Sequence, residues 1–353
     1  MTPAMPHGTL HIDLEAVAAN WTALDTMSEP SVETAAVVKA DGYGLGAVPV
    51  VQRLVQAGAR AFFVVSPEEG LVLRRALGPE PRIYLLYGHM PGDAALIRRA
   101  DLVPMVTSVA QLTLHLESLP RHPFGIQLDT GMNRLGLKEA EWHAVADLAL
   151  AAEPVLLMSH LACADEPDHP MNASQLATFR TMTDGMPVPR SLAATGGTLL
   201  GPDFHFDMTR PGIGLYGAAP YDRAQPTVAL ELPVVACFDV AAGESSGYGA
   251  TWTAPAATRL ATVAGGYADG LPRALAPGMD LMAGPVPCPV VGRISMDLMT
   301  VDIGHLDSDP DTLVAMDPHR GPDALATHAG TIGYEILTSL GRRYARRYRG
   351  GED

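Results

Sequence analysis

One lysine directly follows a short apolar run. We expect a strand over Ala35–Lys39, which places Lys39 at the carboxyl end of that strand. Partial burial there lowers the pKa of a lysine and suits it to covalent Schiff-base chemistry, although a rim lysine in a salt bridge remains the alternative. The glycines that follow do not complete a dinucleotide-binding fingerprint, because Ala47 stands where the third glycine is needed.

Other polar residues are expected at the same rim. His160 ends one run, Thr195 begins a Thr-Gly-Gly-Thr stretch after the next, and Arg210-Pro211-Gly212-Ile213-Gly214 lies within the last run. A threonine hydroxyl together with glycine-rich backbone N–H groups can hold an anion. A reactive lysine and a phosphate cradle at one rim indicate pyridoxal phosphate as the cofactor.

The elements that must position these residues alternate along the first 217 residues. Short apolar runs are separated by segments of helical periodicity, which predicts parallel strands joined by crossover helices. Eight such runs favour a closed (β/α)₈ barrel, whose active sites lie at the carboxyl ends of the strands. The expected strands are Ala35–Lys39, Ala61–Val65, Ile83–Tyr87, Val103–Thr107, Gly125–Asp129, Val155–Leu161, Pro189–Thr195 and Phe206–Tyr216.

The alternation of apolar runs and helical segments stops after Gly217. A proline-bounded linker, Pro220–Pro226, leads into strand-like runs separated by Gly/Pro turns, so we expect a barrel domain over 1–222 and a mostly β domain over 223–353. A helix is expected over Tyr334–Leu340, and the basic stretch Arg342–Arg347 is interpreted as a helix C-terminus. The expected strand runs are Leu230–Val240, Thr258–Ala264, Val286–Ile303 and Thr312–Ala315.

Composition limits the classes of binding partner and the cellular compartment that we expect for this chain. The 353 residues carry a formal net charge of −15, which disfavours nucleic acid and anionic membranes as partners. Three widely spaced cysteines argue against a disulfide framework and for a reducing compartment. No apolar stretch approaches a membrane span, and the N-terminus lacks the features of a secretion signal. We therefore expect a cytoplasmic protein.

Six short stretches follow one another along the chain, at residues 37–44, 128–136, 210–217, 247–251, 266–270 and 292–297. In their order and spacing they resemble alanine racemase, a fold-type III pyridoxal-phosphate enzyme family. Each stretch alone is a weak signal, whereas the ordered set covers nearly the whole chain. The resemblance implies a barrel followed by a β domain, a homodimer with shared active sites, and no metal.

The resemblance also assigns roles in the chemistry. Lys39 is implied to carry the cofactor and to act as one racemisation base, and Tyr248, from the partner subunit, as the opposing base. Arg210 would face the pyridine nitrogen and leave it unprotonated, because a guanidinium does not give up its proton. His160 would lie behind the cofactor ring. A satisfied core histidine is the alternative for that residue.

Further residues are implied to bind the cofactor or the substrate. Arg134 would contact the cofactor's phenolic oxygen and the substrate, although Gln127 replaces the lysine that many relatives carbamylate to orient this arginine. Ala194 also departs from the family pattern and loses a side-chain donor. The implied phosphate ligands are Tyr43, Thr195, Gly212, Ile213 and Tyr334. The implied substrate contacts from the partner subunit are Tyr267, Met296 and Asp297.

The expected activity is racemisation of L-alanine and D-alanine, which supplies D-alanine for peptidoglycan or serves alanine catabolism. Racemisation needs two bases, because a single base tends to restore the original enantiomer. The alternatives are a serine or broad-range racemase and a non-catalytic pyridoxal-phosphate carrier. Carriers resemble the barrel alone, whereas this chain also has the second domain with Tyr248. Metal-dependent lyases are disfavoured because that domain lacks a His-x-Cys pair.

Overall fold

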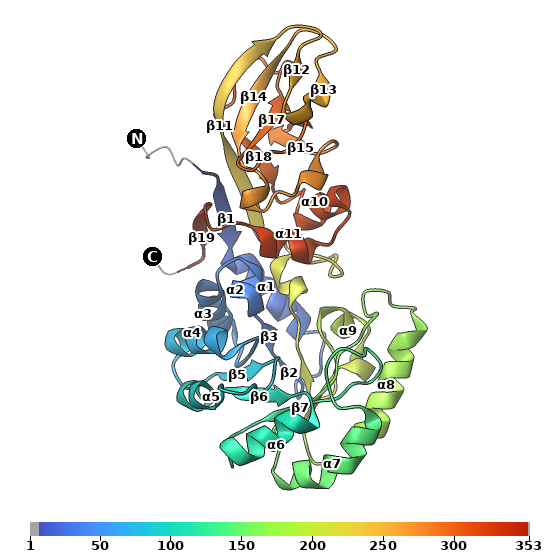
Figure 1. Ribbon diagram of the computed structural model, residues 1–353. Helices are drawn as coiled ribbons and strands as arrows, with labels where there is room; N and C mark the ends of the chain where they lie inside the picture. The colour runs from blue at the N-terminus through green and yellow to red at the C-terminus, as the bar shows by residue number, and fades with distance from the viewer. Residues whose placement is uncertain (1–6, 352–353) are drawn as a thin grey trace. The chain divides into compact units, whose positions relative to one another are not determined.

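The chain folds into two units whose segments interleave along the sequence (Figure 1). The computed structural model describes residues 7–351. One part, here called the barrel unit, comprises residues 17–215 and 219–224. The other, here called the C-terminal unit, comprises residues 7–16, 216–218 and 225–351. The first strand therefore belongs to the C-terminal unit although it precedes the barrel in the sequence.

Parallel strands form the centre of the barrel unit. Seven of them pair in chain order, and strands such as Ala61–Val64 and Val103–Val106 are buried at every position, as continuous apolar runs predict. The seven are β3 (Ala36–Val37), β4 (Ala61–Val64), β5 (Arg82–Leu85), β6 (Val103–Val106), β7 (Gly125–Gln127), β8 (Leu157–Met158) and β9 (Arg190–Ser191).

A second pair of strands, β2 (Glu33–Thr34) and β10 (Met208–Thr209), completes the ring. On one side the Arg210 N–H donates to the Ala193 carbonyl, 2.8 Å away, beyond β9. On the other side the Val37 N–H of β3 donates to the Pro211 carbonyl at 2.9 Å. These bonds join the two ends of the seven-stranded sheet, and the predicted α/β barrel followed by a mostly β domain is confirmed.

Helices cover the outside of these strands (Figure 1). Their ends follow local sequence signals: Pro67 and Pro170 occupy first-turn positions, and Gly58 ends its helix in a left-handed conformation. The helices are α1 (Leu14–Asp25), α2 (Lys39–Tyr43), α3 (Ala47–Ala57), α4 (Pro67–Leu77), α5 (Ala94–Ala100), α6 (Val109–Ser118), α7 (Glu139–Ala151), α8 (Pro170–Thr183) and α9 (Thr195–Leu199), with 3₁₀ turns η1 (Pro202–Phe204) and η2 (Ile213–Tyr216).

The C-terminal unit is built on an eight-stranded sheet of order β14-β17-β16-β15-β18-β11-β1-β19. The long strand β11 also pairs with β14, so six of the strands form a closed ring. The strands are β1 (Thr9–Asp13), β11 (Val228–Val240), β14 (Thr258–Ala264), β15 (Asp280–Ala283), β16 (Val286–Val291), β17 (Leu298–Asp302), β18 (Thr312–Met316) and β19 (Ala345–Arg349), with the small pair β12 (Ser245–Ser246) and β13 (Trp252–Thr253). Its helical segments are α10 (Pro322–Ala329), α11 (Gly333–Ser339), η3 (Tyr248–Ala250), η4 (Tyr267–Asp269) and η5 (Arg273–Leu275).

Two expectations for this unit were wrong. The basic stretch expected to end a helix leads into strand β19, which pairs in parallel with β1 so that Leu10 lies opposite Arg346. The arginines suit this position, because charged side chains protect an edge strand from unwanted pairing. The run Val286–Ile303 is two strands, because residues 292–297 form a loop between β16 and β17.

No helix within residues 7–351 is both long and apolar enough to cross a bilayer.

A buried indole tests the packing of the barrel unit. Trp142 is fully buried on α7, and its Nε1–H donates to the Met182 carbonyl at 2.9 Å. Trp142→Phe should lower the free energy of unfolding by about 1–3 kcal/mol, because the buried carbonyl loses its donor. The control is Trp21→Phe, since Trp21 Nε1 is buried without a partner among residues 7–351. Urea unfolding that gives equal losses for the two variants would contradict this account.

Candidate active site

Lys39 lies at the carboxyl end of β3, as predicted from the apolar run before it. The preceding residue, Val38, is tied to β4 through its N–H, which donates to the Phe63 carbonyl at 2.9 Å. Burial lowers the pKa of Lys39, the charges of Arg134 and Arg210 lower it further, and the charge of Glu69 opposes them. The amine therefore loses its proton more readily than a lysine in water, as a lysine that attacks an aldehyde must.

Arg210 is 3% exposed and is held in place by neighbouring strands. Its Nε–H donates to Ser191 Oγ of β9 at 2.8 Å, and an Nη2–H donates to the Ser159 carbonyl, after β8, at 2.6 Å. Its guanidinium carbon lies 5.7 Å from the centroid of the Phe63 ring. Burial lowers the pKa of Arg210 to about 10, so the guanidinium stays charged at neutral pH.

His160 follows β8 and is only partly exposed. Gln175 of α8 holds its backbone, because Gln175 Nε2 donates to the His160 carbonyl at 2.9 Å. Burial, followed by the charges of Arg210, Arg134 and Lys39, lowers the pKa of His160 to about 3. The imidazole is therefore neutral at physiological pH, so His160 adds no positive charge to the cations around it.

Three of the implied phosphate ligands meet in the barrel unit. Thr195 Oγ1 accepts hydrogen bonds from the Gly212 N–H at 3.0 Å and the Gly214 N–H at 3.2 Å. A β-carbon on Gly212 would collide with the Tyr43 hydroxyl, so the glycine is required for the tyrosine to approach. Both amides occupy the acceptor sites of Thr195, which leaves its hydroxyl hydrogen to donate to an anion. Ile213, the fourth, begins η2 directly after this contact.

Gln127 is the last residue of β7, and Arg134 lies on the loop that follows this strand. Arg134 is exposed, and its charge acts on both Lys39 and His160. Gln127 is buried, and its Nε2 donates to the Leu135 carbonyl at 3.2 Å. The glutamine therefore holds the loop backbone next to Arg134, and an amide cannot carry the charge of a carbamylated lysine.

The remaining predicted residues lie in the C-terminal unit. Tyr267 and Met296 are on adjoining loops, because the Tyr267 N–H donates to the Ser295 carbonyl at 3.1 Å. Tyr248, Tyr267 and Met296 are 74%, 44% and 54% exposed. Tyr334 is the second residue of α11 and is partly buried.

The Asp297 carboxylate is paired rather than open to an anion. It accepts from Arg343 at 2.6 Å, and Arg343 also donates to the buried Asp269 at 2.6 Å. Arg343 was not among the predicted residues, because the basic stretch that contains it was interpreted as a helix end. Glu69, Ser191 and Gln175 were not predicted either, because they carry no motif and act through tertiary contacts.

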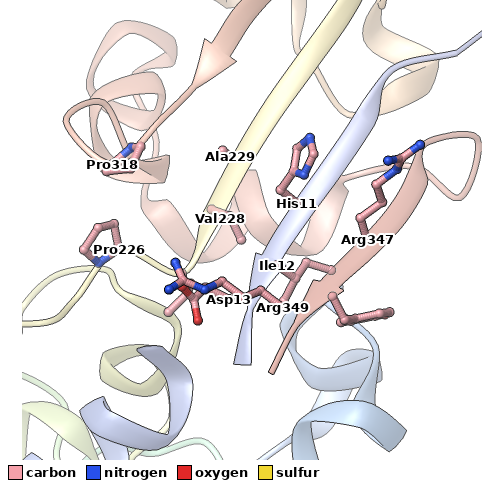
Figure 2. A pocket seen from close by; sticks show the side chains of 11 residues that line it. His11, Ile12, Asp13, Pro226, Val228, Ala229, Pro318, Arg347 and Arg349 are labelled. Carbon is pink, nitrogen blue, oxygen red and sulfur yellow. The ribbon is translucent and has the colours of Figure 1, made fainter. Parts of the chain in front are cut away.

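A separate hollow of about 280 Å³ lies in the C-terminal unit between β1, β11 and β19 (Figure 2). His11, Asp13, Arg347 and Arg349 are among its lining residues. Asp13 Oδ2 lies 3.4 Å from Arg349 Nη1, so these two charges already neutralise each other, and His11 Nε2 lies 3.3 Å from the Glu231 carboxylate. The hollow contains none of the predicted site residues, and no metal-binding group of three or more His, Cys, Asp or Glu side chains occurs in residues 7–351.

Comparison with known proteins identifies relatives of both parts of the chain. The family model for the alanine racemase N-terminal domain matches residues 12–220, and that for the C-terminal domain matches residues 227–348. The chain belongs to the alanine racemase family. It is 62% identical over 344 residues to an alanine racemase of Cereibacter sphaeroides, covering 98% of this chain and 99% of that protein. It is 60% identical over 347 residues to one of Dinoroseobacter shibae, with the same coverage.

Solved structures of the family have the same fold. A crystal structure of alanine racemase from Bartonella henselae with covalently bound pyridoxal phosphate has a TM-score of 0.92 and 36% identity, covering 97% of this chain and 99% of that one. The structure of the biosynthetic alanine racemase from Pseudomonas aeruginosa has a TM-score of 0.90 and 34% identity, with the same coverage. The predicted family membership is thus confirmed over nearly the whole chain.

His160 makes the acid stability of the chain testable. Its pKa is about 3 in the folded chain against 6.5 for an ordinary histidine. Between these values the unfolded chain binds the proton more readily, so acidification favours unfolding by up to about 1.4 kcal/mol per pH unit. Urea unfolding between about pH 7 and pH 5 should show a shallower pH dependence for His160→Gln. His143→Gln, an exposed control on α7, should keep the original dependence. If the unfolding free energy of the two variants depended equally on pH, the lowered pKa of His160 would be refuted.

Proposed function

We propose that this chain racemises alanine with pyridoxal phosphate by a two-base mechanism. The observation that carries the proposal is the position of Lys39: a partly buried amine at a strand end whose pKa two arginines depress. The relatives named alanine racemase, up to 62% identical, support alanine as the substrate. The D-alanine formed would enter peptidoglycan synthesis or alanine catabolism.

The residues of the barrel unit fit the cofactor. Lys39 would attach its aldehyde carbon, and the Thr195 and Tyr43 hydroxyls beside Gly212 and Ile213 would hold its phosphate. The family resemblance adds Tyr334, of the C-terminal unit, to the proposed phosphate ligands. Arg210 would donate a hydrogen bond to the ring nitrogen, and His160, neutral, would lie against the ring. When bound, pyridoxal phosphate supplies an electron sink that makes the Cα–H bond of alanine acidic.

Proton transfer then falls to two side chains. Lys39 Nζ would remove or return the α-proton on one face of the substrate, and Tyr248 Oη would do so on the other. Each base must sit within hydrogen-bond reach of Cα, with a pKa near the working pH. The barrel unit shifts the pKa of Lys39 in this direction by burying the amine beside Arg134 and Arg210.

The substrate carboxylate needs donors rather than acids. Arg134 supplies a cation, and Tyr267 and Met296 would narrow the entrance. Asp297 cannot hold an anion through its carboxylate, so its proposed part is indirect: it holds Arg343 at 2.6 Å. We place Tyr248, Tyr267, Met296 and Asp297 in the site of a partner subunit, within a homodimer. The high exposure of Tyr248 supports this, since a partner surface would cover it.

The chain has only two lysines, Lys39 and Lys138, which allows a matched test. Borohydride treatment in the presence of pyridoxal phosphate should fix the cofactor to Lys39, mapped by peptide mass. Lys39→Ala should remove this adduct and lower the alanine racemisation rate by at least about 100-fold, the smaller contribution expected of a general base. Lys138→Ala, at the exposed start of α7, should retain both. An adduct at Lys138 would refute the proposal.

Activity of the wild type with cofactor bound separates the alternative functions. Faster racemisation of serine than of alanine would favour a serine or broad-range racemase, and racemisation of neither amino acid would favour a non-catalytic carrier.

Subunit mixing tests the shared site. Lys39→Ala and Tyr248→Phe should each be nearly inactive alone. In a mixed dimer one site carries both changes, and the other combines wild-type Lys39 with wild-type Tyr248. Random exchange of equal amounts should therefore restore about a quarter of the wild-type rate, because half the dimers are mixed and each has one intact site. No recovery in a demonstrated heterodimer would show that both residues come from one chain.

A further inference from the structure

Glu69 connects the turn after Lys39 to the end of the neighbouring strand. It lies in the first turn of α4, outside every motif used above. Its Oε1 accepts a hydrogen bond from the Ala40 N–H at 2.8 Å, and its Oε2 accepts one from the Val65 N–H, also at 2.8 Å. A single carboxylate thus joins the residue after Lys39 to the residue after β4.

The turn held by Glu69 has an unusual backbone. The φ angles of Ala40, Asp41, Gly42 and Tyr43 are 54°, 55°, 64° and 55°. Only glycine adopts this left-handed conformation readily, so the three other residues persist in it only where their surroundings hold them. Two side chains do so: Glu69 at the Ala40 N–H, and Asp41 Oδ1 at the Ala47 N–H, 2.9 Å away.

Glu69 also supplies a negative charge near the Lys39 amine. Arg134, from the loop after β7, and Arg210, after β10, lower the pKa of Lys39, and the Glu69 carboxylate on α4 raises it. His160, after β8, is neutral at physiological pH because its pKa is about 3. A base must be able to hold the proton it removes, and a lysine facing two arginines alone would hold it poorly.

We propose that Glu69 is a positioning residue for Lys39. Through the Ala40 N–H it sets the direction in which the chain leaves β3, and its charge partly offsets those of Arg134 and Arg210. The proposal rests on the role proposed above for Lys39, because the position of the amine matters only if it reacts. Asp41 braces the far end of the same turn, and Glu69 braces the end that carries the lysine.

Two lysines make the charge effect directly measurable. The full-length chain, labelled with ¹³C at the lysine ε-carbons and freed of aldehyde cofactor, should give two titrating NMR signals. In Glu69→Gln the Lys39 midpoint should move to lower pH, while the Lys138 midpoint stays unchanged. Glu68→Gln is the matched control, since this exposed neighbour on the same turn does not act on Lys39. An unchanged or raised Lys39 midpoint in folded Glu69→Gln would overturn the charge part of the proposal.

Amide hydrogen exchange tests whether Glu69 holds the turn through the Ala40 N–H. In Glu69→Ala, hydrogen–deuterium exchange of the peptide that contains Ala40 should be faster than in wild type, with peptides of α7 unaffected. Equal protection would overturn the bracing part, and circular dichroism establishes that the variants fold. If Glu69→Ala does not fold, Glu69→Asp takes its place, because its shorter side chain cannot span both amides.

In the enzyme with pyridoxal phosphate bound, Glu69→Gln should lower kcat more than it changes KM for alanine. The titration and exchange measurements do not require racemase activity, so they can fail independently of the proposed function.

Discussion

Positive charge is crowded at the rim of the barrel where the parallel strands end. Arg134, Arg210 and Lys39 act on one another across a partly buried space, in which charges interact more strongly than in water. Burial and these charges together make deprotonation of Lys39 and His160 easier than usual, whereas Arg210 keeps its proton at neutral pH. The contrast between a fixed cation and nitrogens that yield their protons more readily follows from burial first and from the crowded charges second.

The surrounding strands are arranged to hold the buried cation. Arg210 needs acceptors where water has little access, and the ends of β8 and β9 provide the Ser159 carbonyl and Ser191 Oγ. Behind them, Thr130 Oγ1 and Ser159 Oγ lie 2.8 Å apart, and Gln175 donates to Thr130. This network extends from α8 to the guanidinium. Removal of an inner member would therefore disturb the site without touching any reacting atom.

The sequence predicted the residues whose position depends on a local pattern. Lys39 and Thr195 each fall where an apolar run stops, and the ends of parallel strands meet at one rim. Arg210 was expected within a strand over Phe206–Tyr216, whereas β10 ends at Thr209, directly before it. Glu69 follows no such rule, because its contact with Ala40 spans 29 residues and depends on how α4 packs against the turn. The pairing of β1 with β19 joins the two ends of the chain, which periodicity alone could not reveal. In a strand such as β19, with arginines at three of five positions, the hydrophobic alternation is also too weak to recognise.

The two proposed bases reach their working state by different routes. The groups that shift the pKa of Lys39 belong to the barrel unit of its own chain: burial, Arg134 and Arg210 lower it, and the Glu69 carboxylate raises it. Tyr248 begins a short turn between β12 and β13 and is 74% exposed. A phenol in water holds its proton well above neutral pH, so a tyrosine that serves as a base needs a cation beside its hydroxyl. The exposure of Tyr248 leaves room for another surface to supply that cation. On the proposed dimer, that surface is the rim around the partner's lysine, and only assembly would complete the second base.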